Sequence, residues 1–354
     1  MSDPPAKPPR TNVIYAIIAL NLIAFAIELA AGADAFSPNA LDVLKVGANY
    51  APMTLHGEPW RIVTAMFLHF GAIHIGMNML CLWQGRIVEQ IFGPLPFAAI
   101  YVVSGLVGGV ATLLRGDPVV SAGASGAVFG VYGAFAAVLV LRRARIPADV
   151  WQKTARSMGT FLAINLMIGL GVPGIDLRAH VGGLVGGFAC GAVLLAGAKA
   201  SWRRPLALFA GGIAIAGAAI ALAPKPSDYL GALDELARVE KAANARIDDI
   251  KARLAAGKIS GAQAADELER DVIAPWSAAS RRMEGIEPPA ASREVYDAMR
   301  SYASARDVDL ATWVALLRAP ASEHEARTKE LQRTNAAVHA AGDAVREASA
   351  RKRR

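Results

Sequence analysis

The chain has 354 residues, of which 54% are hydrophobic, and a formal net charge of +7. Residues 1–224 hold only 15 Lys/Arg and 9 Asp/Glu, whereas residues 225–354 hold 22 and 21. This composition excludes an ordinary soluble domain for the first part and indicates a membrane region followed by a solvated tail. Most of the excess positive charge belongs to the membrane part, where Lys and Arg set topology, so we expect no nucleic-acid partner.

Seven apolar runs are candidate transmembrane segments, several of them short or rich in glycine. A helix needs roughly 17–25 apolar residues to cross a hydrocarbon core of about 30 Å. The runs cover residues 13–31, 69–91, 97–114, 120–141, 157–172, 177–197 and 205–223. The sequence therefore predicts an all-α polytopic membrane protein with four segments: an N-terminal cytoplasmic tail (1–12), a membrane core (13–200), a seventh transmembrane helix (201–224) and a polar helical C-terminal domain (225–354).

The Lys and Arg residues predict the orientation, because they accumulate in loops that stay cytoplasmic. With a cytoplasmic N-terminus, eleven of them lie on the cytoplasmic side and four on the other. Seven spans then put the C-terminal domain outside, and both the fourth and the sixth spans start at the outer face. We expect a multi-pass protein of the plasma (bacterial inner) membrane. The first run is interpreted as a retained span, with a cleaved signal peptide as the alternative.

Two kinds of residue within the runs have plain structural interpretations. Glu28 lies near the outer end of the first span, where we expect an interfacial carboxylate that reaches water. Cys81 and Cys190 both lie in apolar runs and are expected to be buried free thiols.

The second span carries a polar pair, His74 and Asn78, spaced four residues apart. In a helix both project from one face. Their N–H groups carry no permanent charge, which suits an oxygen that becomes negative only in a transition state. The alternative is ordinary hydrogen bonding between helices, which is common in membrane bundles.

The fourth and sixth spans each begin with a polar residue followed by glycines. Ser125 stands between Gly123 and Gly126, and His180 precedes Gly183 and Gly187. A serine and a potential base are the pair that nucleophilic catalysis needs. Glycines spaced four apart let helix backbones approach closely, which could bring the starts of the two spans within hydrogen-bond reach. Packing without catalysis is the more common meaning of such spacing.

Taken together, these residues resemble the rhomboid family of intramembrane serine proteases. The resemblance covers roughly residues 13–197 and rests on motifs in the family's order: Trp60-Arg61, His69, His74, Asn78, Gly123-Ala124-Ser125-Gly126, and Ala179-His180 with Gly183 and Gly187. It implies a six-helix core with a seventh helix and a Ser125–His180 dyad. It also implies an oxyanion site from His74, Asn78 and the Ser125 backbone N–H, and a lateral gate near the fifth span.

One position departs from the family pattern. Phe129 stands where many members have Tyr. A ring that can stack on His180 remains, but its hydroxyl is lost. Trp60-Arg61 resembles the family's structural loop and is given no catalytic role.

The resemblance further implies transmembrane protein substrates, met within the lipid bilayer and cut near the outer face. A helical segment must unwind locally before its peptide bonds can be cleaved, which favours Gly, Pro or polar residues near the site. No cofactor or metal is expected.

The C-terminal domain is predicted to be helical. Leu236, Ile247 and Ile250 recur at helical spacing, Gly257 can end that helix, and Ser260 with Gln263 forms a capping box for the next. Trp276 and Trp313 are predicted core residues, with contact to a partner as the alternative, and Ser322 with Glu325 is predicted to start a long polar helix. This domain is a candidate for binding a protein partner, and no second active site is expected in it.

Three other classes of protein compete with a protease. A transporter would be expected to show internal repeats, which the chain lacks. A haem or metal protein could use His69, His74 and His180, but Ser125 between glycines would then have no role. A catalytically inactive rhomboid-like binding or quality-control protein is the main alternative, although such proteins typically lose the Ser or the His and this chain keeps both.

Overall fold

The computed structural model describes residues 12–114, 119–171, 176–196, 202–288 and 292–352. The chain divides into two units, Met1–Pro226 and Ser227–Arg354. Nearly all described residues are helical, and the described strands form a single two-stranded pair. The predicted class, an all-α polytopic membrane protein, is confirmed.

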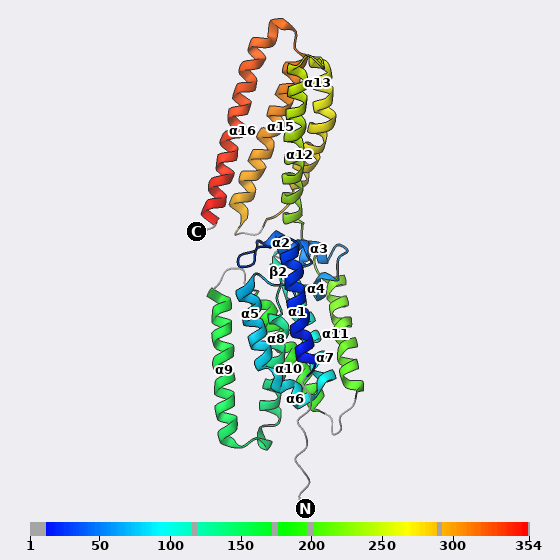
Figure 1. The fold of residues 1–354 in the computed structure, drawn as a ribbon, viewed down its shortest axis with the longest axis vertical. Coiled ribbons are helices and arrows are strands. Elements are labelled where there is room, and N and C mark those ends of the chain that lie inside the picture. The colour runs from blue at the N-terminus through cyan, green and yellow to red at the C-terminus, as the bar shows by residue number, and fades with distance from the viewer. Residues whose placement is uncertain (1–11, 115–118, 172–175, 197–201, 289–291, 353–354) are drawn as a thin grey trace, which may run out of the picture. The chain divides into compact units, whose positions relative to one another are not determined.

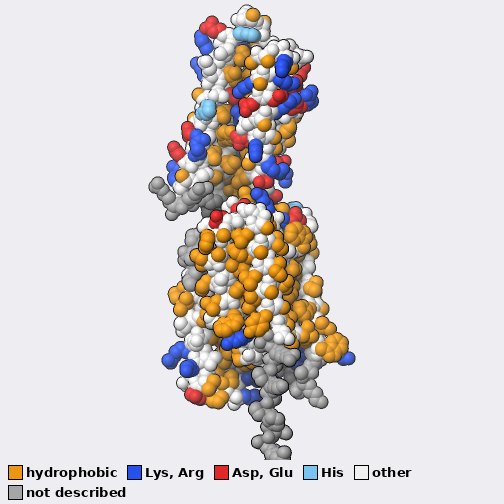
Figure 2. Space-filling model, viewed as in Figure 1, with side chains coloured by type: hydrophobic (Ala, Val, Ile, Leu, Met, Phe, Trp, Pro, Cys, Tyr) orange, Lys and Arg blue, Asp and Glu red, His pale blue; other side chains and the backbone are white. Residues whose placement is uncertain are grey.

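The first unit is a bundle of long helices (Figure 1). Its main helices are α1 (Val13–Ala30), α5 (Ala72–Gln84), α6 (Arg86–Phe92), α7 (Pro94–Leu113), α8 (Ser125–Leu141), α9 (Ala148–Gly171), α10 (Leu177–Leu195) and α11 (Arg203–Leu222). Among the described residues, four helices are long and apolar enough to cross a membrane: α1, α7, α10 and α11. The apolar α8 is slightly shorter. Hydrophobic side chains cover the visible surface of this unit (Figure 2), as expected of a surface that faces lipid.

The helices match the seven predicted spans with three differences. The second span is two helices, because the chain breaks at Gly85 between α5 and α6. The fourth span was predicted from residue 120, but its helix begins only at Ser125, since residues 120 and 121 form a strand. The fifth helix begins at Ala148, well before the predicted start at 157. Hydropathy misses this extension because its first turns are polar.

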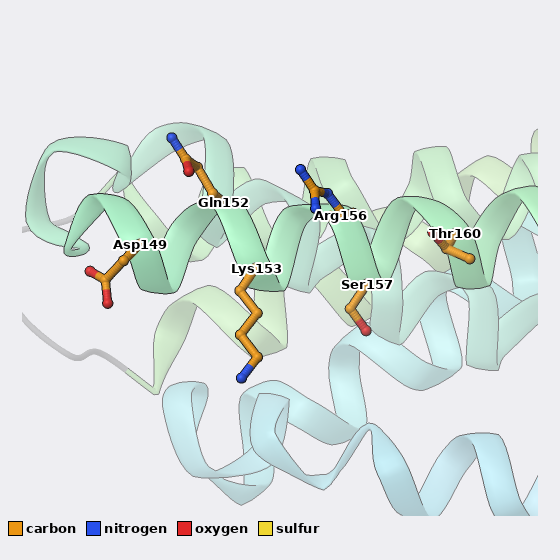
Figure 3. A pocket seen from close by; sticks show the side chains of 6 residues that line it. All are labelled: Asp149, Gln152, Lys153, Arg156, Ser157 and Thr160. Atoms are coloured by element: carbon orange, nitrogen blue, oxygen red, sulfur yellow. The ribbon is translucent and has the colours of Figure 1, made fainter.

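These polar turns of α9 form an open cavity of about 530 Å³. Figure 3 shows its lining side chains, which all project from α9: Asp149, Gln152, Lys153, Arg156, Ser157 and Thr160. The lining contains neither Ser125 nor His180, so this cavity is separate from the candidate active site.

Short elements connect α1 to α5. They are α2 (Ala40–Lys45), β1 (Asn49–Tyr50), α3 (Ala51–Thr54) and α4 (Arg61–Thr64), and β1 pairs antiparallel with β2 (Val120–Ser121). Buried Arg61 holds this segment together, because its guanidinium donates to the carbonyls of Leu44 and Ala48 and pairs with Glu58. The Trp60-Arg61 pair is thus a structural element of the loop.

Two buried carboxylates fix the ends of α1. Glu89, on α6, accepts the free backbone N–H groups of Asn12, Val13 and Ile14 at the start of the helix. Glu28, near the other end, is only 1% exposed and accepts the backbone N–H of His69 at 2.9 Å. The prediction that Glu28 is a water-reaching interfacial carboxylate is wrong, because the loop before α5 folds over it.

The two cysteines of the chain, Cys81 and Cys190, are free and buried, as predicted. Both lie in the core cluster that α1, α5, α7, α8 and α10 build together.

The second unit is a helical bundle of its own, with charged side chains of both signs on its surface (Figure 2). It comprises α12 (Tyr229–Ala255), α13 (Gly261–Leu268), the π-helical turn η2 (Glu269–Ile273), α14 (Ala274–Met283), α15 (Arg293–Arg318), the 3-10 turn η4 (Ala321–Glu323) and α16 (His324–Lys352). The π-turn precedes Pro275, which has no N–H to give to the preceding helical turn.

The local signals predicted for this unit are largely present. Ser260 and Gln263 form the capping box of α13, and Gly257 follows α12 with a positive φ of 63°. Trp276 is buried in the core, whereas Trp313 lies at its margin beneath the Lys251 ammonium. Ser322 does not cap α16, because it lies inside the 3-10 turn that precedes this helix.

Candidate active site

Ser125 and His180 meet at the starts of two neighbouring helices. Ser125 is the first residue of α8, and His180 lies in the first turn of α10. The His180 Nε2 atom is 2.8 Å from the Ser125 Oγ atom. This distance is within the range for a serine activated by a general base. The two residues are 55 positions apart in the chain, so the contact is made entirely by helix packing.

Glycines let α8 and α10 pack backbone against backbone. An ideal Cβ on Gly183 would lie 1.9 Å from the Gly126 carbonyl oxygen, and one on Gly187 would lie 1.9 Å from that of Gly130. Both positions therefore require glycine at this separation. This is the close approach that the spacing predicted, and it sets the distance between Ser125 and His180.

The neighbouring glycines of α10 serve a different helix. An ideal Cβ on Gly182 would lie 2.8 Å from the Ala111 methyl group, and one on Gly186 would lie 3.1 Å from Val107. Both contacts are with α7. Helix α10 therefore packs between α7 and α8, two of the helices at the centre of the unit (Figure 1).

An aromatic stack orients the His180 ring. The Phe129 and His180 rings have centroids 4.5 Å apart and planes 10° apart. To accept the Ser125 proton at Nε2, the neutral ring must carry its own proton on Nδ1. Nδ1 is buried and has no hydrogen-bond partner among the described residues. Among the described residues, it is therefore the stack on Phe129, and no hydrogen bond to Nδ1, that fixes the plane of the His180 ring.

A side-chain contact with α7 fixes the start of α10. Asp176 caps this helix by accepting the backbone N–H of Ala179, and its other oxygen is hydrogen-bonded to the Thr112 hydroxyl. The Asp176 carbonyl accepts the backbone N–H of His180 at 3.3 Å. Sequence reasoning missed both residues. Asp176 could have been found as an N-cap signal three residues before Ala179, whereas Thr112 gives no local signal.

His74 lies beside the backbone that precedes Ser125. Its Nδ1 accepts the backbone N–H of Phe70, so in the neutral ring the proton is on Nε2. An ideal Cβ on Gly123 would lie 2.9 Å from His74 Cε1 and 3.5 Å from Ser125 Oγ. Gly123 has a φ of +141° as well, so both its backbone conformation and its lack of a side chain leave room between His74 and Ser125.

Two further N–H donors were predicted for this region. Asn78 is buried, and its side-chain amide donates one of its two protons to the His74 carbonyl at 2.9 Å. The Ser125 backbone N–H is in the first turn of α8, where N–H groups have no partner within the helix. The structure thus brings Ser125, His180 and His74 together from α8, α10 and α5, whereas the described hydrogen bond of the Asn78 side chain reaches only the His74 carbonyl on its own helix.

The fold and this site define a polytopic helical membrane protein with a serine–histidine pair inside its helical bundle. The family model described as the rhomboid domain matches residues 56–197, which include every residue of the site. Residues 56–197 are thus a rhomboid domain.

Curated relatives match the same part of the chain. The rhomboid protease GluP of Bacillus subtilis (strain 168) is 36% identical over 191 residues, which are 52% of this chain and 35% of that protein. RHOMBOID-like protein 6, mitochondrial, of Arabidopsis thaliana is 36% identical over 172 residues, 47% of this chain and 54% of the relative. For RHOMBOID-like protein 1 of the same plant the identity is 36% over 166 residues, 45% of this chain and 40% of the relative. The chain thus spans about a third to a half of the length of these relatives.

Proposed function

We propose that the protein is an intramembrane serine endopeptidase in which Ser125 is the nucleophile and His180 is its base. The observation that carries this proposal is the 2.8 Å contact between Ser125 Oγ and His180 Nε2. A half-buried hydroxyl and a buried imidazole within a membrane bundle are costly unless they serve a function, and this pair has the geometry of nucleophilic catalysis. The rhomboid domain and similarity to a rhomboid protease support the same reaction.

The mechanism follows from the ring geometry. Ser125 Oγ attacks the scissile carbonyl while His180 Nε2 takes its proton, and the Phe129 stack keeps the imidazolium plane fixed. His180 then gives this proton to the leaving amine. In the second half of the reaction, His180 takes a proton from a water molecule that attacks the acyl-enzyme carbonyl, and it returns this proton to Ser125 Oγ as the acid product leaves. A stacked phenyl ring suffices for this orienting role, so Phe129 is compatible with activity.

The oxyanion formed during attack needs donors that are already in place. The Ser125 backbone N–H, the His74 Nε2–H and the second amide proton of Asn78 supply them in this proposal. The hydrogen bond from Phe70 to His74 Nδ1 supports it, because that bond keeps the His74 proton on the nitrogen nearer Gly123.

The proposed substrate is a transmembrane segment of another membrane protein, entering sideways from the bilayer. Entry near α9 is supported by the few side-chain contacts that its described residues make with neighbouring helices: Trp151 donates to the Leu139 carbonyl, and Phe161 stacks on Tyr132. The substrate segment must unwind before cleavage, and the family resemblance adds a small residue before the cut.

The proposed location is the plasma (bacterial inner) membrane, with the N-terminus in the cytoplasm and the C-terminal domain outside. The eleven-to-four distribution of Lys and Arg supports this orientation. Cleavage would then occur near the outer face, where water can reach a site at the starts of α8 and α10.

Active-site labelling tests the proposal. A fluorophosphonate should label the purified wild type once per chain, and Ser125→Ala should abolish both labelling and cleavage of a transmembrane substrate. His180→Ala should reduce both to background, because an unactivated hydroxyl is a weak nucleophile. For Asn78→Ala we expect a loss of about 10²–10³ in rate or less, since the other donors remain.

The competing function is that of a catalytically inactive rhomboid-like protein that binds membrane proteins. A folded wild type that neither labels nor cleaves would favour it. Folded Ser125→Ala protein that still cleaved would refute the assignment of the nucleophile.

A further inference from the structure

Glu28 is a buried carboxylate that the mechanism above does not use. It lies in α1 and is 1% exposed. One of its oxygens accepts the His69 backbone N–H at 2.9 Å, and the other is buried without a partner among the described residues. A carboxylate in a membrane bundle is costly, so one that is kept there calls for a functional explanation with a named partner.

His69, the residue that Glu28 binds, also contacts the backbone next to the nucleophile. The His69 side chain is fully buried, and its Nδ1 lies 3.1 Å from the Phe67 carbonyl, to which it can only donate. Nε2 is then an acceptor, and the backbone N–H of Ala124 donates to it at 3.4 Å. Ala124 is the N-cap residue of α8 and directly precedes Ser125.

The loop that follows α1 holds the same segment at a second point. The backbone N–H of Ala72, the first residue of α5, donates to the Ala35 carbonyl at 2.7 Å. An ideal Cβ on Gly71 would lie 2.6 Å from the Phe36 carbonyl oxygen, so the two loops are in backbone contact. The segment that carries His69 is therefore fastened on one side to α1 and on the other to the backbone before Ser125.

We propose that Glu28 is a positioning residue for the nucleophile. Its carboxylate anchors the His69 backbone, the His69 ring holds the Ala124 N–H, and this chain of contacts keeps Ser125 in register with His180. The inference rests on the proposed function, in which Ser125 attacks the substrate. Glu28 itself touches neither substrate nor reacting atoms.

The same helix offers a matched control. Asn21 is also a buried polar residue of α1 with one unpartnered oxygen, and it donates to the Ile17 carbonyl and toward the Tyr101 hydroxyl. None of these contacts reaches the segment that precedes Ser125. Asn21→Leu therefore removes a buried polar group from α1 without touching the chain of contacts to Ser125.

The experiment compares Glu28→Leu, Glu28→Gln and Asn21→Leu in the full chain, purified in detergent. The measurements are the rate constant of fluorophosphonate labelling per active site, kcat and KM for a transmembrane substrate, and amide hydrogen exchange at residues 123–126. We expect Glu28→Leu to lower kcat and the labelling rate constant by about 10²-fold with little change in KM. The reason is that a displacement of the nucleophile by about 1 Å from its reactive position lowers the rate by about this factor. Exchange at Ala124 should accelerate.

Glu28→Gln should stay within a few-fold of the wild type, because its amide oxygen accepts the same hydrogen bond. Asn21→Leu should lower thermal stability but leave the labelling rate constant per folded site unchanged. Equal labelling rate constants in Glu28→Leu and Asn21→Leu would overturn the inference, as would a loss in Glu28→Gln as large as in Glu28→Leu.

His69→Phe decides the matter if Glu28→Leu does not fold. This variant keeps a ring but removes the acceptor of the Ala124 N–H, so a labelling rate constant equal to that of the wild type would overturn the inference. Failure of the wild type to label at Ser125 is a different result, because it refutes the proposed function itself.

Discussion

Replacing Gly183 by alanine should disable the site by pushing two helices apart. The added Cβ would lie 1.9 Å from the Gly126 carbonyl oxygen and 2.7 Å from its carbon. Both atoms are backbone, so no side chain can turn away to make room. A carbon–oxygen contact needs about 3.3 Å, which requires α8 and α10 to separate by roughly 1 Å or more.

This separation acts directly on the dyad. The Ser125–His180 contact of 2.8 Å would lengthen to nearly 4 Å, beyond the reach of a hydrogen bond. We expect a loss of about 10²-fold in the labelling rate constant and in kcat. Overpacking of this kind also destabilises a protein by about 1–3 kcal/mol.

The assay is fluorophosphonate labelling of detergent-purified protein, together with its thermal unfolding. Gly217→Ala, on α11, is the matched control because nothing lies within 4 Å of its ideal Cβ. Alanine is also favoured over glycine in a helix by about 1 kcal/mol, so this variant should fold and label like the wild type. If Gly183→Ala labelled at the wild-type rate, the glycine contact would not set the dyad distance and the reasoning would fail.

Three further predictions concern the start of α10, the topology and the C-terminal domain. Thr112→Val should slow labelling of Ser125 and lower kcat several-fold with KM unchanged, because Asp176 loses its hydrogen bond to α7; an unchanged kcat would contradict this positioning role. A reporter fused after Arg354 should be active only when exported, and activity of a cytoplasm-dependent reporter there would show the orientation or the seventh span to be wrong. Truncation after Ala223 should leave cleavage of a model substrate measurable, because every site residue lies before residue 198, and a folded truncated core without turnover would disprove the independence of the two parts.

The sequence by itself determined the membrane class and predicted the serine, the histidines and the glycines of the candidate site. Apolar runs have to match the thickness of a bilayer, so their lengths reveal the helices whatever their packing. The glycines after Ser125 and His180 also indicate from the sequence alone that two helices pack closely there, because only glycine lets two backbones approach to this distance. The capping box of Ser260 and Gln263 could also be predicted from the sequence, because both partners lie within one helical turn.

Only the tertiary structure decided the contacts that reach across the chain. The Thr112–Asp176 contact joins residues 64 positions apart, and the bond from His69 to Glu28 spans 41 positions. Neither Thr112 nor Glu28 belongs to a sequence motif that would indicate its partner. The position of Glu28 near the end of a span therefore predicted, wrongly, that its carboxylate reaches water. Burial and partners of such side chains depend on which helices pack together and on where a loop folds back. The sequence pattern of one helix does not contain this information.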